Sequence, residues 1–331
     1  LNVALGDVAQ VSTQPGKLFD RLSGGNFAAP MAAFWRGGLF DNDERLAFCE
    51  DGEGAYRALR RGLEIAFEPG AIVSHSGWRS SQERQHQYSG YALSQAAFSG
   101  KYLRRGDLFI AKRMLLNLGR AGRRWLVGTI NKNTEMAALG RAYVSQFPAG
   151  LWRGLRSNQR PPSLADARPD NPDTRAIALP QGANSIAVIL LTFDQKQQTL
   201  RCLEHLLKQR TEDLAFDVVV WDIGSSDGTA AAIEAAYPSV RVFVSDDNLG
   251  VAGGRNAAAQ ATIGAIAPEL LLFLVHDLVV APGFVAGLAN PFFADSAGYL
   301  GQTQAKLRLA DAPTLLNDGG GCRLQLWLGR S

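Results

Sequence analysis

An acidic, glycine-rich turn follows an apolar stretch within residues 218–229, and its residue types could bind a nucleotide. Asp222 ends the apolar stretch, where its carboxylate could accept a hydrogen bond from a base or a ribose. Ser225, Ser226 and Asp227 are residue types that cap a following helix. Taken alone, the pattern is explained more simply by a capped turn than by a ligand site.

A second glycine-rich segment, residues 248–256, places glycines ahead of Arg255 at the predicted start of a helix. Backbone amides at a helix start and a guanidinium are both suited to the oxygens of a diphosphate. The segment lacks the G-x-G-x-x-G spacing of dinucleotide-binding turns, which disfavours a Rossmann dehydrogenase.

A third candidate, Asp277, follows the apolar run at residues 270–275. A carboxylate at the end of a buried strand is well placed for a divalent metal that neutralises a pyrophosphate. An aspartate at a strand end is as often a turn former, so this residue alone decides nothing.

The elements that position these residues alternate regularly. The pattern predicts strands at 186–193, 216–221, 240–244 and 270–275, and helices at 199–207, 229–236 and 252–263. Such alternation indicates an α/β fold with a parallel sheet covered on both faces, and such sheets bind ligands at the carboxyl ends of their strands.

The first half of the chain is less regular. Its pattern places residues 57–63 in a helix that begins near Gly52, followed by two short strands at 65–67 and 71–74. Residues 82–125 are predicted to be mostly helical, with breaks at glycines.

Taken together, the three segments resemble the nucleotide-sugar half of family 2 glycosyltransferases, which have the GT-A fold: a mostly parallel sheet flanked by helices. The family's strand-end Thr-Tyr-Asn, its Asp-Asn-Gly-Ser-Thr-Asp-Gly-Thr turn and its Asn-x-Gly…Arg-Asn element match residues 192–194, 222–229 and 248–256. This chain departs from the family's Asp-x-Asp motif at the next strand end, because Val275 occupies the position of the first Asp. The resemblance implies nucleotide-binding roles for Thr192, Asp194, Asp222, Gly224, Ser225, Asp227, Asn248, Gly250, Arg255 and Asn256.

The first half resembles the other end of the same family. Residues 23–27, 36–41, 49–62 and 73–77 are similar to its Gly-x-Asn, Gly-Gly-Phe-Asp-Glu, Glu-Asp and late His elements. The resemblance implies Asp51 as the catalytic base, with Glu50 orienting it or contacting the acceptor. It also implies that Gly25, Asn26 and Trp78 contact the sugar or acceptor, and that His75 and His276 join Asp277 at a Mg²⁺ or Mn²⁺ ion.

The two halves stand in reversed order relative to the family. Residues 1–147 correspond to the acceptor and catalytic-base half with trailing helices, residues 148–184 to a proline-rich linker, and residues 185–331 to the nucleotide-sugar half. Two explanations remain open: a circular permutation, or a fragment across the junction of two tandem transferase domains, which the ends of the chain favour. In the second case the candidate residues would belong to two different active sites.

Composition narrows the class of protein further. The chain has 331 residues, 46% hydrophobic and 20% charged, enough for about two globular units. Intrinsic disorder and a membrane span are excluded, and three scattered cysteines disfavour both a disulfide framework and a thiolate zinc site. A reducing compartment fits best, and we expect a cytoplasmic protein.

The net charge of +3 is unevenly distributed: residues 1–170 carry 23 basic and 15 acidic side chains, and the remainder carries 11 and 16. Nine basic residues lie within 101–132, where Asp107 is the single acid. This stretch either lies on an anionic membrane surface or packs as an ordinary solvated helix. The absence of a recognised binding motif disfavours nucleic acid as a partner.

The expected function is therefore transfer of a sugar from a UDP or dTDP type donor to a saccharide or lipid-linked acceptor, with inversion and with a divalent metal, in polysaccharide or cell-envelope glycan synthesis. A degenerate sugar-nucleotide-binding module without activity is one alternative, suggested by Val275. A sugar nucleotidyltransferase is another, but residues 194–197 are a poor version of the basic, glycine-rich loop that it needs after its first strand.

Overall fold

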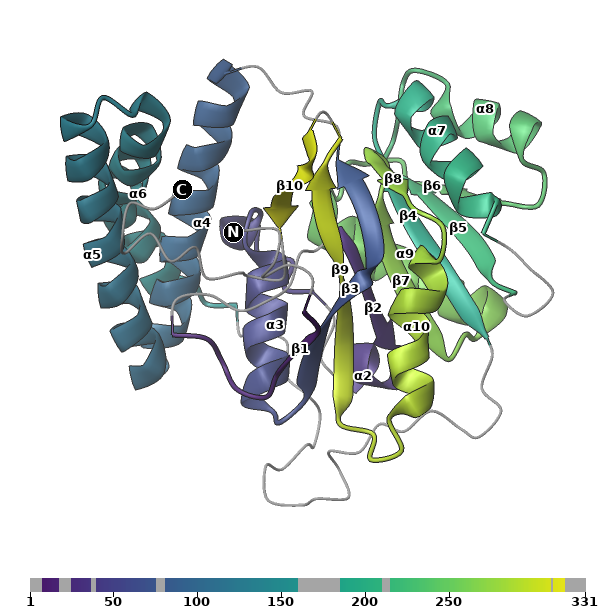
Figure 1. Ribbon diagram of the computed structural model, residues 1–331, viewed down its shortest axis with the longest axis horizontal. Coiled ribbons are helices and arrows are strands. Elements are labelled where there is room, and N and C mark those ends of the chain that lie inside the picture. The colour runs from purple at the N-terminus through teal and green to yellow at the C-terminus, as the bar shows by residue number, and fades with distance from the viewer. Residues whose placement is uncertain are drawn as a thin grey trace.

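The computed structural model describes residues 8–17, 25–36, 40–75, 81–159, 185–209, 215–310 and 312–318. Trp78 and residues 160–184 of the expected linker lie outside the described residues. The described part is a mixed α/β structure in which an open, mostly parallel sheet is flanked by helices, consistent with the expected GT-A fold (Figure 1).

One sheet runs through the described residues in the order β1-β3-β9-β2-β7-β4-β5-β6, with β10 paired to β9 and β8 paired to β3. Its strands are β1 (Gln10–Ser12), β2 (Asn26–Pro30), β3 (Glu64–His75), β4 (Ile186–Thr192), β5 (Asp217–Asp222), β6 (Arg241–Val244), β7 (Leu270–Val275), β8 (Leu278–Val280), β9 (Leu300–Leu309) and β10 (Ala312–Asp318).

The strand and helix alternation predicted after residue 185 is confirmed. Strands β4, β5, β6 and β7 pair in parallel, because the polypeptide crosses between them through α7 (Lys196–Leu207), α8 (Thr229–Ala236) and α9 (Gly250–Ile266). The four strands therefore direct their carboxyl ends to one edge of the sheet.

The strands of the two predicted halves alternate within this sheet. Strand β2 comes from the first half, yet it lies between β7 and β9 of the second half and is antiparallel to both. Strand β3, also from the first half, pairs in parallel with β9 and in antiparallel with β8. In this structure the two halves are thus one sheet rather than two separate units.

Residues 64–75 form a single strand where the sequence predicted two short ones. The gap between the two predicted strands contains Pro69 and Gly70. In the structure this gap is a register shift against β9 between Glu68 and Ile72, and the strand continues past it. A bulge accommodates the missing proline N–H without ending the strand.

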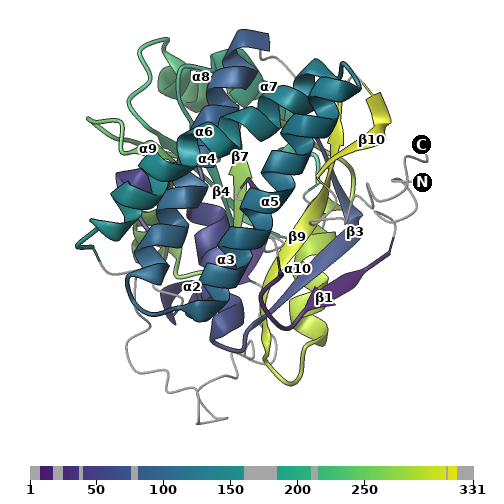
Figure 2. The same ribbon diagram turned by 90° about the vertical axis from the view of Figure 1, so that its left-hand side faces the viewer.

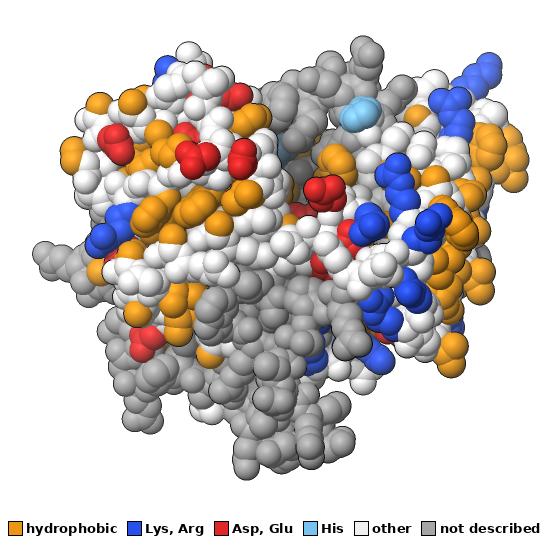
Figure 3. All heavy atoms as spheres, turned by 180° about the vertical axis from the view of Figure 1, so that it is seen from behind, with side chains coloured by type: hydrophobic (Ala, Val, Ile, Leu, Met, Phe, Trp, Pro, Cys, Tyr) orange, Lys and Arg blue, Asp and Glu red, His pale blue; other side chains and the backbone are white. Residues whose placement is uncertain are grey.

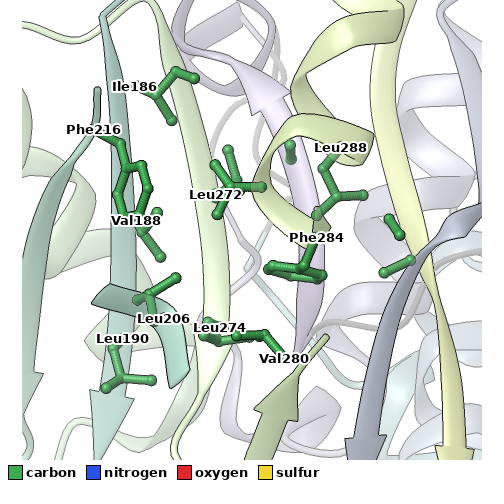
Figure 4. Packing of buried hydrophobic residues seen from close by; sticks show 14 of the residues in the cluster. Ile186, Val188, Leu190, Leu206, Phe216, Leu272, Leu274, Val280, Phe284 and Leu288 are labelled. Atoms are coloured by element: carbon green, nitrogen blue, oxygen red, sulfur yellow. The ribbon is translucent and has the colours of Figure 1, made fainter. Parts of the chain in front are cut away.

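Helices cover both faces of the sheet. On one face, Leu203 and Leu206 of α7 and Phe284 and Leu288 of α10 (Phe284–Ala294) pack against alternate residues of β4 and β7, such as Leu272 (Figure 4). On the other face, α9 and α3 (Glu50–Arg60) contribute Ala258, Ala259, Ala55 and Leu59 to a second apolar cluster. The continuous apolar sequence of β4 and β7 follows from this burial on both faces.

Three long helices, α4 (Ser81–Leu103), α5 (Leu108–Ile130) and α6 (Thr134–Leu155), form a bundle beside the sheet (Figures 1 and 2). A cluster of Tyr56, Phe98 and Ile110 attaches the bundle to α3. The short helices α2 (Met31–Arg36) and η1 (Glu44–Leu46) lie between β2 and α3 in the chain.

Two expectations for this region are wrong. The linker does not begin at residue 148, because α6 continues to Leu155 with Pro148 inside it. Most glycines do not interrupt the helices either: Gly106, at φ +81°, lies between α4 and α5, but Gly100 lies within α4. A Cβ at Gly100 would lie 2.4 Å from the Leu151 carbonyl oxygen, so this glycine serves close helix contact.

Within the described residues, no helix combines the length and the apolar character that crossing a membrane requires.

Because α4 and α6 pack closely, replacing a glycine at their contact should cost more stability than replacing a glycine elsewhere in the bundle. A Cβ at Gly154 would lie 2.0 Å from the Ala97 carbonyl oxygen, whereas a Cβ at Gly119 of α5 meets nothing within 4 Å. We expect Gly154→Ala to lower the free energy of unfolding by about 1–3 kcal/mol, because the helices must separate. Gly119→Ala should leave it unchanged or raise it by about 0.5–1 kcal/mol. Urea unfolding measures both, and equal effects of the two substitutions would contradict this packing.

Candidate active site

Two loops at the carboxyl ends of β4 and β5 are tied together by the predicted nucleotide-binding residues. Asp222 is buried at the end of β5, and its Oδ1 accepts a hydrogen bond from the Ser225 amide at 2.8 Å. Asp194 follows β4 with φ +48°, its amide donates to Ser225 Oγ at 2.9 Å, and its Oδ1 accepts from the Ser226 amide at 2.7 Å. The acidic turn is thus held in one conformation beside β4.

Asp227 has a capping role in this turn. Its Oδ1 accepts from the Thr229 amide at the start of α8, and its Oδ2 accepts from the Lys196 amide at 3.0 Å. The hydrogen bond from the Thr229 hydroxyl is the first cause that lowers the pKa of Asp227. Thr192 is buried, and its hydroxyl pairs with that of Thr199 at 2.7 Å. Both side chains are therefore used within the fold.

The glycine-rich segment before α9 is exposed at its start. Asn248 Oδ1 accepts from the Gly250 amide at 2.9 Å, and Gly250 has φ +66°. Gly224 in the neighbouring turn also has a positive φ of +79°. Left-handed backbone at these two positions explains the glycines, since other residues rarely adopt it.

Arg255 and Asn256 lie one turn further along α9 and face the first half of the chain. Arg255 is 3% exposed, and its Nη1 lies 3.2 Å from Glu50 Oε1. Its guanidinium also lies over the ring of Phe40, 5.1 Å from the centroid. Asn256 brackets the Phe40 backbone, accepting from its amide and donating to its carbonyl at 2.9 Å each. These contacts join the two halves beside the glycine-rich segment.

Glu50 and Asp51 occupy the N-terminal turn of α3, next to this junction. Burial, and then the charge of Asp51, raises the pKa of Glu50 to about 7. Asp51 is half-buried, and its Oδ1 accepts from the Gly52 amide at 2.6 Å. A helix N-terminus stabilises carboxylates, so two acidic side chains can be held close together there.

The candidate metal ligands are only partly brought together. His75 Nε2 at the end of β3 lies 3.0 Å from Asp277 Oδ2 in the turn after β7. His276 directs Nδ1 toward the Leu191 carbonyl oxygen, 3.3 Å away. Within the described residues, no group of three or more His, Cys, Asp or Glu side chains could hold a metal ion. One nitrogen and one carboxylate oxygen nevertheless suit a cation whose other ligands come from phosphate and water.

Val275 packs against the start of β2. Its amide donates to the Gly25 carbonyl at 3.2 Å, and a Cβ at Gly25 would lie 2.9 Å from Val275 Cγ2. Asn26, which follows Gly25, is fully buried, and among the described residues neither its Nδ2 nor its Oδ1 has a hydrogen-bond partner. A buried amide without partners is costly, which makes Asn26 the clearest sign of a missing polar ligand or water.

Residues 187–308 match the model of the protein family described as Glycosyl transferase family 2. Glycosyltransferase AglE of Haloferax volcanii is 28% identical over 95 residues. This segment belongs to family 2 of the glycosyltransferases. The alignment with AglE covers 28% of the present chain and 30% of AglE, so the chain matches less than a third of that relative.

The family 2 segment contains all the predicted nucleotide-binding residues and Asp277, from Thr192 onward. Glu50, Asp51 and His75 lie outside the matched residues. Glu50 contacts the segment at Arg255, and His75 contacts it at Asp277.

The sequence did not reveal a buried charge network that holds residues 41–43, which precede α3 in the chain. Lys101, counted among the basic residues of 101–132, is fully buried, with Nζ 2.5 Å from Asp41 Oδ2 and 3.2 Å from Asp43 Oδ2. Ser157 Oγ also donates to Asp43 Oδ2, at 2.7 Å. The Gly-Gly-Leu-Phe-Asp resemblance at residues 36–41 offered a signal for Asp41, but nothing in the sequence indicated its partner.

Proposed function

We propose that this chain transfers a glycosyl group from a nucleoside-diphosphate sugar to a hydroxyl acceptor, at one site to which both halves contribute. The observation that carries the proposal is the pair of contacts across the junction: Arg255 with Glu50, and Asp277 with His75. They place the Glu50 and Asp51 turn beside the carboxyl edge of the family 2 segment. A permuted domain explains this arrangement better than two separate active sites.

The donor's nucleoside would bind at the acidic turn around Asp194 and Asp222, and its diphosphate near the exposed residues 248–250 at the start of α9. Two features support this: hydrogen bonds hold the turn in one conformation, and a Cβ at Gly250 would meet nothing within 4 Å, so a ligand can approach the backbone there. UDP and dTDP are the donor classes that the family resemblance implies. The unpartnered amide of Asn26 offers a donor and an acceptor to the sugar or the acceptor.

His75 and Asp277 would hold the divalent cation. Bound there, a Mg²⁺ or Mn²⁺ ion would neutralise charge on the departing diphosphate. Position 275 supplies no ligand, because valine has none, and the His276 ring faces the Leu191 carbonyl. The described residues therefore offer two ligands, which would make cation binding dependent on the diphosphate.

Asp51 would act as the general base in a single displacement. The acceptor oxygen attacks the anomeric carbon, the bond from that carbon to the diphosphate breaks, and the hydroxyl proton moves to Asp51. Glu50 would orient this turn through its contact with Arg255. One displacement inverts the anomeric configuration.

A donor-hydrolysis assay with UDP-sugars and dTDP-sugars in the presence of Mn²⁺ tests this role, alongside titration calorimetry with UDP. We expect Asp51→Asn to lower turnover by about 10²–10⁴-fold without weakening UDP binding, because it removes only the base. Glu234→Gln, an exposed carboxylate change on α8, is the control and should retain activity. UDP binding by the unaltered chain without turnover would instead support the non-catalytic module suggested by Val275.

We also propose that the outer face of α5, within residues 101–132, contacts an anionic membrane on its cytoplasmic side. Leu108, Leu115, Leu126 and Ile130 are 63–80% exposed there. Basic side chains gather with hydrophobic ones on the side of the molecule that the bundle forms (Figure 3). An apolar stripe flanked by Lys and Arg is typical of helices that lie in a membrane interface. A lipid-linked acceptor would be reached from this position.

Sedimentation with vesicles containing phosphatidylglycerol tests the contact. We expect Leu115→Glu together with Leu126→Glu to abolish most of the bound fraction, because two carboxylates would enter the interface. Phe293→Glu, an exposed apolar residue on α10, should leave binding unchanged. Equal binding by the unaltered chain, the double variant and the control would show that this face of α5 is not the membrane contact.

A further inference from the structure

A cavity of about 210 Å³ lies inside the helical bundle, outside the residues that match the family 2 model. It is lined by all three helices, with Arg120 and Arg124 from α5, Tyr88 and Tyr91 from α4 and Tyr143 from α6 (Figure 2 shows the three helices). Its walls combine charged, aromatic and amide groups, which is the composition of a ligand site rather than of a packing defect.

The two arginines lie one helical turn apart, and none of the described residues that line the cavity is acidic. Within the described part of the chain, neither Arg120 nor Arg124 forms an ion pair or a hydrogen bond. Both are half-buried, and burial followed by the charge of Arg120 lowers the pKa of Arg124. Like charges at this spacing destabilise a helix, so an anion between them would stabilise the bundle.

A third group points to the same kind of ligand. The Tyr143 hydroxyl oxygen is buried and has no hydrogen-bond partner among the described residues, although the residue lines the cavity. Glu135, an exposed residue at the start of α6, accepts a hydrogen bond from Tyr88 Oη at 2.9 Å, and among the described residues it forms no ion pair with either arginine. Arg120, Arg124 and the Tyr143 hydroxyl therefore carry donors that no described residue uses.

We propose that this cavity binds the phosphate group of a phosphorylated ligand, through Arg120, Arg124 and the Tyr143 hydroxyl. Guanidinium groups bind phosphate oxygens in pairs, and a neutral hydroxyl adds one more donor. Tyr91, Ala92 and Leu139 would contact the apolar part of the ligand. The phosphate can come from a free metabolite or from the headgroup of a lipid, since exposed leucines of α5 lie on the same helix.

Two arms of one experiment distinguish these sources in the full chain without added metal. Titration calorimetry with inorganic pyrophosphate probes a free ligand, and sedimentation with phosphatidic acid vesicles, against phosphatidylcholine vesicles, probes a headgroup. The test variant is Arg120→Gln with Arg124→Gln. The matched control is Arg141→Gln with Arg153→Gln, which removes the same charge from exposed positions of α6. Tyr143→Phe tests the hydroxyl, and circular dichroism checks that each variant folds.

A free phosphate ligand predicts that Arg120→Gln with Arg124→Gln weakens pyrophosphate binding at least tenfold, while the control retains it. A lipid headgroup predicts the same contrast in the bound fraction on phosphatidic acid vesicles only. Tyr143→Phe should weaken binding several-fold in whichever arm responds. Equal behaviour of the test and control variants in both arms, including no binding by any protein, would overturn the proposal. Neither arm measures sugar transfer, and substitutions in α5 would not affect pyrophosphate bound near residues 248–250. The contrast between the test and control variants is therefore independent of the proposed transferase activity.

Discussion

The position of β2 between β7 and β9 is the constraint on which the rest of the structure depends. Five residues, Asn26–Pro30, pair with β7 along their full length and with β9 at Phe27 and Ala28. Phe27 stacks on Phe273 with ring centroids 4.9 Å apart, which adds packing energy to the backbone ladder. Without this strand, β7 and β9 would each present an unpaired edge in the middle of the sheet.

The site follows from that pairing. It brings Gly25 and Asn26 against Val275 and the turn that holds Asp277, and β3, further along the sheet, carries His75 to the same turn. Arg255 and Glu50 then meet on the side of the sheet covered by α3 and α9. A buried ion pair adds little net stability, but breaking one partner leaves an uncompensated charge. The contact therefore fixes the position of the Glu50 and Asp51 turn more than it strengthens the fold.

The elements of the second half could be predicted because local sequence determines them. Strand β7 and helix α8 have the predicted bounds, since each is a short apolar or alanine-rich run between clear turn residues. The acidic turn was likewise recognisable from its residue order. The pairing of β2 with β7 was not, because the paired residues lie 240 to 248 positions apart in the chain and no periodicity encodes a non-local pairing.

Side-chain direction was also beyond local reasoning. Arg255 was expected at the diphosphate, but it is buried against Glu50, and Lys101 is buried between two aspartates. Glycines predicted to interrupt the bundle instead allow its helices to touch, which only the neighbouring helix reveals.

The most direct test of the account is a double-mutant cycle between Glu50 and Arg255, measured by urea unfolding at pH 8, where Glu50 is ionised. Glu50→Gln and Arg255→Gln are made singly and together. If the two halves share one site, each single substitution destabilises the chain, and the cycle gives a coupling of about 1–3 kcal/mol. Additive effects, within about 0.5 kcal/mol, would show that the two residues do not meet and would contradict the shared site.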